Sequence, residues 1–77
     1  MNNNREQQYK MLGLNIAYYR KLHGLTQLQL AELAGISRTH MSNIEAPNMP
    51  TSISLDTLMD LADALEIPVS LLLTFKP

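Results

Sequence analysis

The amino-acid sequence predicts an all-α domain of five short helices without strands, and three observations support this prediction. Hydrophobic residues recur at helical spacing in segments on both sides of a central stretch. The central stretch carries the capping and turn residues of two short helices joined by a tight turn. With 77 residues, of which 45% are hydrophobic and 17% charged, the composition is that of one small globular domain.

The central stretch, residues 26–45 (TQLQLAELAGISRTHMSNIE), predicts a helix-turn-helix. Its two helices are expected over residues 27–33 and 38–46. Gly35 separates them because glycine adopts a left-handed conformation at no steric cost. Apolar residues are spaced so that the two helices can pack together, and these residues are Leu30, Ala31, Ala34, Ile36, Met41 and Ile44.

Both helices of the motif begin at residues that cap helices well. The Thr26 hydroxyl can accept a hydrogen bond from the first turn, and Gln29 can reach back to complete a capping box. Ser37 can cap the second helix in the same way.

A longer amphipathic helix is expected before the motif, over residues 6–22, following a disordered tail over residues 1–5. One stripe of this helix is apolar and comprises Tyr9, Leu12, Ile16 and Tyr19. Gly13 costs about 1 kcal/mol within a helix, so it indicates a close neighbour. Gly24 is expected in a left-handed conformation where the helix ends.

After the motif, an irregular loop over residues 46–54 leads to a fourth helix over residues 55–66, capped by Ser54. The buried stripe expected for this helix comprises Leu55, Leu58, Met59, Ala62 and Leu65. Leu61 lies off that stripe and is expected to be partly exposed. A last helix is predicted over residues 68–73, because proline is well tolerated at a first helical position.

At these residues the sequence resembles the lambda-repressor-like (Cro/Xre-type) DNA-binding family. The resemblance rests on TQxxLAxxxGIS followed by RTxxSxIE and extends over about residues 12–73. It implies a compact five-helix domain over residues 6–77, with the helix-turn-helix as its second and third helices. The implied function is sequence-specific binding of double-stranded DNA by a dimeric transcriptional regulator, a repressor, whose second motif helix enters the major groove.

The resemblance also implies the residues that contact DNA. The expected base contacts, on the exposed face of the second motif helix, are Arg38, Thr39, Ser42 and Asn43. Arg38 suits guanine O6 and N7, and Asn43 suits adenine N6 and N7, because each side chain can make two hydrogen bonds to that base edge. The expected phosphate contacts are Gln27, His40, Asn48 and Thr51.

One pair of residues that matches the family pattern is expected to hold two helices together and not to contact DNA. In the family, an arginine late in the first helix pairs with a glutamate that ends the recognition helix, and Arg20 and Glu45 occupy these positions. A guanidinium binds a carboxylate through two parallel hydrogen bonds, which lysine cannot reproduce.

The sequence departs from the family in ways that concern DNA affinity. The formal net charge is −1, although a nucleic-acid-binding protein usually has a basic patch. The loop over residues 46–50 has no basic side chain, Ala17 replaces a common arginine, and Glu66 replaces a common glycine. Five basic residues lie in the first half, namely Arg5, Lys10, Arg20, Lys21 and Arg38.

The last helix suggests how two copies associate. Members of this family act as two-fold dimers on palindromic operators, and an exposed apolar patch commonly marks an interface. The residues expected at the dimer interface are Leu71, Leu72, Leu73 and Phe75. The alternative is that all four pack on the fourth helix of the same chain.

No enzymatic, metal or cofactor motif is found in the sequence, so we expect a protein that is not an enzyme and needs no metal or cofactor. There is no cysteine, signal peptide or membrane-spanning run, and no effector domain for a small molecule, which favours a cytoplasmic protein. The competing interpretation is a protein-interaction module, antitoxin-like or an adaptor, that keeps the fold and binds a protein partner.

Overall fold

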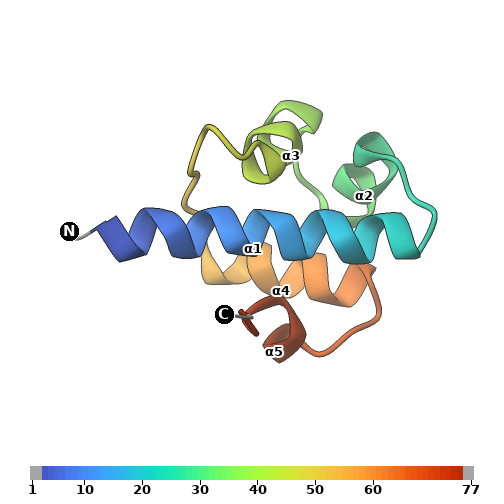
Figure 1. Ribbon diagram of the computed structural model, residues 1–77. Coiled ribbons are helices and arrows are strands. Elements are labelled where there is room, and N and C mark those ends of the chain that lie inside the picture. The colour runs from blue at the N-terminus through green and yellow to red at the C-terminus, as the bar shows by residue number, and fades with distance from the viewer. Residues whose placement is uncertain (1–2, 76–77) are drawn as a thin grey trace.

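The computed structural model describes residues 3–75 and has five helices, of which the later four are arranged around the long first one (Figure 1). The helices, in chain order, are α1 (Asn3–Leu22), α2 (Gln27–Ala34), α3 (Arg38–Glu45), α4 (Leu55–Ala64) and α5 (Val69–Leu72). In the view of Figure 1, α2 and α3 lie on one side of α1 and α5 on the other, with α4 behind α1. Across residues 3–75 there is no strand, so the predicted all-α, five-helix fold is confirmed.

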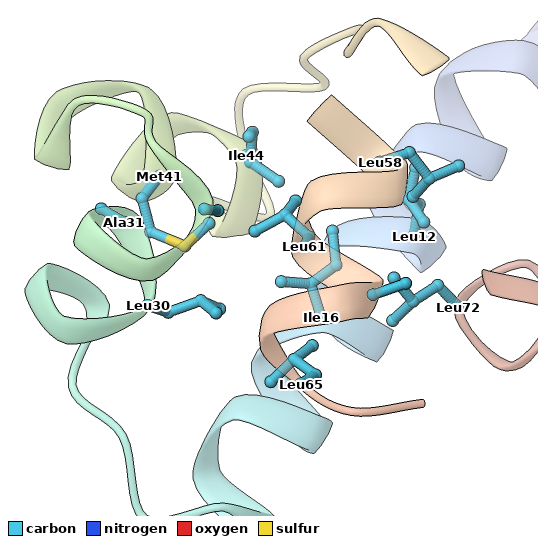
Figure 2. Packing of buried hydrophobic residues seen from close by; sticks show 12 residues of the cluster. Leu12, Ile16, Leu30, Ala31, Met41, Ile44, Leu58, Leu61, Leu65 and Leu72 are labelled. Carbon is cyan, nitrogen blue, oxygen red and sulfur yellow. The ribbon is translucent and has the colours of Figure 1, made fainter. Parts of the chain in front are cut away.

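A single apolar core joins all five helices (Figure 2). Ile16 of α1 and Leu61 of α4 are fully buried between the helices of the motif and α5. The remaining buried side chains are Leu12, Leu30, Ala31, Ala34, Met41, Ile44, Leu58, Ala62, Leu65 and Leu72. All six apolar positions predicted for the motif contribute, five as buried residues and Ile36 as a partly buried one.

Gly13 brings α1 and α3 close together, as its position within a helix predicted. A Cβ atom at this position would collide with the backbone carbonyl oxygen of Ile44. Because the obstacle is backbone rather than a flexible side chain, only glycine allows α1 to pack this closely against the end of α3.

Several helix boundaries differ from the prediction, by one residue at the ends of α2, α3 and α5 and at three further places. The first helix begins at Asn3 rather than at about Glu6, so the expected disordered tail is helical from residue 3, and residues 1 and 2 lie outside the described part. The fourth helix ends at Ala64. Pro68 precedes α5 as its N-cap residue instead of occupying the first helical position.

The predicted buried face of α4 was wrong in part. Leu61 is 0% exposed, whereas Leu55 and Met59 are 63% and 45% exposed. The reason is tertiary, because α4 packs against both α2 and α5. Its buried face is therefore centred on Leu61 and includes Leu58 and Ala62, and Leu55 and Met59 lie outside it.

Leu72 was wrongly predicted to lie at a dimer interface. Its side chain is 0% exposed and belongs to the core. The short α5 lies across α4 and α1, so one of its three consecutive leucines must point inward. Leu71 and Leu73 remain 37% and 48% exposed, and Phe75 packs against the edge of the core.

Candidate nucleic-acid interface

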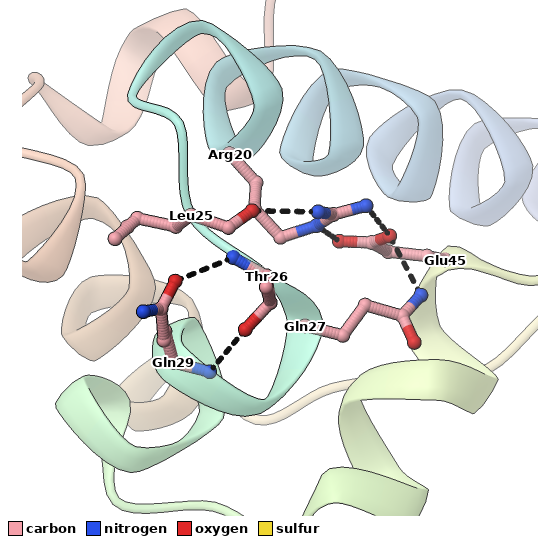
Figure 3. A network of polar contacts seen from close by, with 6 residues as sticks. All are labelled: Arg20, Leu25, Thr26, Gln27, Gln29 and Glu45. Carbon is pink, nitrogen blue, oxygen red and sulfur yellow. Dashed lines mark hydrogen bonds and ion pairs between the residues drawn. The ribbon is translucent and has the colours of Figure 1, made fainter.

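The first helix of the motif is fixed at its start by the capping box that the sequence predicted. The backbone N–H of Gln29 donates to Oγ1 of Thr26 at 3.0 Å, and the backbone N–H of Thr26 donates to Oε1 of Gln29 at 2.9 Å (Figure 3). These two bonds satisfy two backbone donors that would otherwise have no partner at the helix start.

The turn between α2 and α3 depends on Gly35 and Ser37. Gly35 has φ of 74°, and the backbone N–H of Ile36 donates back to the Ala31 carbonyl at 3.0 Å, which closes α2. Oγ of Ser37 then accepts the backbone N–H of His40 at 3.0 Å, which starts α3. The direction of α3 is thus set by local hydrogen bonds.

Burial of one face of α3 turns its other face outward. Met41 and Ile44 are buried against the core. Of the four predicted base-contact residues, Arg38, Thr39 and Ser42 are exposed and Asn43 is half-buried.

These four residues border one hollow on the surface. The hollow has a volume of about 220 Å³, and it is lined by Gln27, Arg38, Thr39, Ser42 and Asn43. The structure thereby brings together the predicted base contacts and the first predicted phosphate contact. No carboxylate lines this hollow, so its polar groups are amides, hydroxyls and one guanidinium.

The predicted pair of Arg20 and Glu45 is present and links α1 to the end of α3 (Figure 3). Nε of Arg20 donates to Oε2 of Glu45 at 2.7 Å, and Nη2 donates to Oε1 at 2.9 Å. Nη1 donates to the carbonyl of Leu25 at 2.8 Å. The guanidinium therefore fixes both the recognition helix and the connection that follows α1.

Gln27 also belongs to this network, which the sequence prediction missed. Its Nε2 donates to Oε1 of Glu45 at 2.9 Å (Figure 3). An amide nitrogen carries two hydrogens, so one remains for a phosphate oxygen. The carboxylate thus orients the side chain that we expected to contact the DNA backbone, a link that no sequence motif signalled.

The other predicted phosphate contacts differ in their surroundings. The Thr51 hydroxyl lies 2.8 Å from the carbonyl of Met49 and 3.2 Å from that of Asn43. Its single hydrogen is used within the chain, so the hydroxyl has no hydrogen left to donate to a phosphate. Asn48 is exposed on the loop, and the His40 side chain is half-buried.

Among residues 3–75 there is no group of histidine, aspartate and glutamate side chains that could hold a metal ion. None of the helices in this part is long and apolar enough to cross a membrane.

Comparison with known proteins identifies the family. Residues 16–72 match the family described as Helix-turn-helix. The chain is 38% identical over 65 residues to the control protein C.SmaI of Serratia marcescens, covering 84% of this chain and 75% of that protein. It is 36% identical over 66 residues to the transcriptional regulator SinR of Bacillus subtilis (strain 168), covering 86% of this chain and 59% of that protein.

A solved structure agrees with this result. The restriction-modification controller protein C.AhdI from Aeromonas hydrophila superposes with a TM-score of 0.77 at 30% sequence identity, covering 83% of this chain and 94% of that one. The fold and the capped motif define a helix-turn-helix protein. The chain belongs to the helix-turn-helix family of DNA-binding transcriptional regulators, which are not enzymes.

Proposed function

We propose that two copies of this chain bind a palindromic operator, each with α3 in the major groove, and repress transcription. The single observation that carries this proposal is the hollow between α2 and α3, which is lined by one polar side chain of α2 and four of α3 and by no carboxylate. In helix-turn-helix proteins the start of the second motif helix reads base edges while the first motif helix meets the backbone.

The base contacts that we propose come from the exposed face of α3. Arg38 is exposed and stands at the first position of the helix, where it can donate two hydrogen bonds to one guanine. Asn43 can pair with adenine, and Thr39 offers a methyl group to thymine. Ser42 is small enough to let the helix approach the floor of the groove.

The phosphate contacts that we propose are fewer than in a strongly basic protein. Gln27 contributes its remaining amide hydrogen, aided by the positive end of the α2 dipole. His40 and Asn48 can contribute contacts at the edges. With Arg20 paired to Glu45 and a net charge of −1, binding should be modest for one copy and sensitive to salt.

Repression by such a protein would be steric, because a dimer on a promoter blocks access of RNA polymerase. The likeness to two control proteins and a transcriptional regulator supports regulation at promoters. The location that fits this role is the cytoplasm, and regulation would come from abundance or a partner rather than from a small-molecule effector.

A second candidate function is protein interaction, as an antitoxin-like protein or an adaptor. The observations that favour it are the net negative charge and a loop over residues 46–50 without basic side chains. Under this alternative the face of α3 would not select any DNA sequence.

The experiment is selection from a random duplex pool at low salt, followed by fluorescence anisotropy of the selected duplex across a salt series. We expect a palindromic consensus whose affinity falls steeply with salt. Absence of enrichment by folded protein would contradict DNA binding and favour the protein-partner alternative.

A further inference from the structure

The proposed DNA-binding surface has few cations. Among the five residues that line the hollow between α2 and α3, only Arg38 is positively charged. Arg20 cannot add a second cation, because its guanidinium is paired with the carboxylate of Glu45. Affinity for DNA depends largely on cations that neutralise phosphates and release their counterions. A cation beside the phosphate-contacting side chain of Gln27 would therefore strengthen binding, and the last turn of α1 carries one.

This cation is Lys21, which lies on the flank of α1 that borders α3. Gly13, Ala17 and Lys21 follow one another at four-residue spacing, so they form one row along the helix. The row begins where Gly13 meets the backbone of Ile44 at the end of α3. Because four residues turn by about 40° more than one full turn, the row moves from this contact toward solvent. It passes the small, half-buried Ala17 and ends at Lys21, which is exposed.

The end of α1 brings Lys21 beside the start of α2. The Lys21 carbonyl accepts the backbone N–H of Gly24 at 2.9 Å, so the chain turns toward α2 directly after this residue. The neighbouring Arg20 and the amide of Gln27 donate to the same oxygen of Glu45, each at 2.9 Å (Figure 3). The side chain proposed to contact phosphate therefore belongs to one network with the residue next to Lys21.

The ammonium group of Lys21 is available to a partner from outside the chain. Among residues 3–75 no carboxylate forms an ion pair with it, and it donates no hydrogen bond. A cation in the last turn of a helix also interacts favourably with the helix dipole, which is a structural role that does not involve DNA. The two roles differ in their consequences, because only a contact with phosphate changes how DNA binding depends on salt.

We propose that Lys21 binds the phosphate group that Gln27 contacts, and this inference rests on the proposed DNA-binding function. The Gln27 amide, oriented by Glu45, fixes the position of the phosphate. Lys21 supplies the charge that an amide lacks, and its flexible four-carbon stem allows the ammonium to reach a phosphate oxygen. A contact of this kind positions the protein on the duplex without reading its sequence.

The first test is the salt dependence of DNA binding by the wild type, Lys21→Gln and Lys21→Arg. Fluorescence anisotropy is measured on the selected duplex and on a random-sequence duplex. Loss of one phosphate contact in each of two bound copies should lower the slope of log affinity against log salt by about 1.8. Between about 50 and 200 mM salt, Lys21→Gln should therefore lose roughly tenfold less affinity than the wild type. Lys21→Arg keeps the charge and should keep the wild-type slope.

Ser70→Asp is the control for net charge. Lys21→Gln removes one positive charge, and Ser70→Asp adds one negative charge, so both variants have the same net charge. Ser70 is exposed on α5, which lies on the other side of α1 from the motif (Figure 1). Its substitution should leave the slope at the wild-type value. A purely structural role of Lys21 would lower the melting temperature of Lys21→Gln and leave its slope unchanged.

The second test locates the phosphate. The selected duplex is prepared with a single uncharged methylphosphonate at successive backbone positions, and the affinity of each duplex is compared with that of the unmodified one. We expect one position per half-site at which the modification weakens binding by the wild type but has a smaller effect on both Lys21→Gln and Gln27→Ala. Different positions for the two variants would overturn the shared phosphate.

The outcomes separate this inference from DNA binding itself. A wild-type slope in Lys21→Gln would overturn the Lys21 contact, and DNA binding would stand. A slope lowered equally by Ser70→Asp would also overturn it, because net charge rather than a contact would then be the cause. Failure of the folded wild-type protein to bind any duplex would contradict the proposed function and this inference together.

Discussion

The helix-turn-helix and the α4–α5 segment reverse the direction of the chain by different means. Within the motif, the left-handed position that closes α2 is occupied by Gly35, with φ of 74°. After α4, the corresponding left-handed position is occupied by Glu66, with φ of 57°. A residue with a side chain loses about 1–2 kcal/mol of stability in this left-handed conformation. The motif avoids this strain because it uses glycine, whereas the segment after α4 retains it.

The two regions also differ in how their buried faces are determined. Capping residues and glycine fix where α2 and α3 begin and end, so the apolar residues between them define one inward face. The buried face of α4 depends instead on its packing against α2 and α5, which are separate segments of the chain. The buried faces of α2 and α3 can therefore be predicted from the local sequence, whereas the buried face of α4 cannot.

The largest effect is expected from Leu61→Ala. Removing a fully buried leucine side chain from the centre of α4 should lower the free energy of unfolding by about 2–5 kcal/mol. The matched control is Leu55→Ala on the same helix, which is 63% exposed and should change stability by less than about 1 kcal/mol. Urea denaturation followed by circular dichroism measures both, and equal losses would contradict the observed face of α4.

Gly13→Ala tests the close contact between α1 and the motif. Helix propensity alone predicts stabilisation by about 1 kcal/mol. We expect destabilisation by about 1–3 kcal/mol, since the new methyl group meets the carbonyl of Ile44. Thermal unfolding measures the sign of the change, and a stabilised variant would contradict this packing.

Arg20→Lys tests the geometry of the link between α1 and α3. Lysine keeps the positive charge but cannot reproduce the two parallel bonds to Glu45 together with the bond to Leu25. We expect a loss of about 1–2 kcal/mol in the free energy of unfolding. A variant as stable as the wild type would indicate that charge alone is sufficient here.

The smallest effect, of opposite sign, is expected from Glu66→Gly. Relief of the left-handed conformation should outweigh the greater flexibility of the unfolded chain and stabilise the protein by about 0.5–1 kcal/mol. The same change at an ordinary helical position, Asp60→Gly in α4, should destabilise it by a similar amount. Denaturation midpoints distinguish these results, and a loss of stability in Glu66→Gly would contradict strain at this position.

Much of the fold and part of the site could be predicted from the sequence, for physical reasons. Thr26, Gly35 and Ser37 act on backbone groups within a few residues of themselves, so their roles follow from sequence position. Leu61 and Leu72 could not be placed, because their burial depends on helices distant in sequence.

The site residues also divide into those whose roles could be predicted from the local sequence and those whose roles depend on contacts between distant segments. The exposed face of α3 follows from its buried face and could be predicted. The bond from Gln27 to Glu45 and the use of the Thr51 hydroxyl within the chain could not, because both depend on the folded positions of separate segments.

The most direct test of the central claim, that the exposed face of α3 reads DNA bases, is Arg38→Ala. Its affinity should be measured by fluorescence anisotropy for the selected duplex and for a scrambled duplex of the same composition. We expect specific affinity to fall by about 1–3 kcal/mol, roughly 5- to 150-fold, with a much smaller loss on the scrambled duplex. Gln27→Ala, as the phosphate-contact control, should weaken both duplexes alike. Equal losses on the two duplexes from Arg38→Ala would contradict base recognition by this residue.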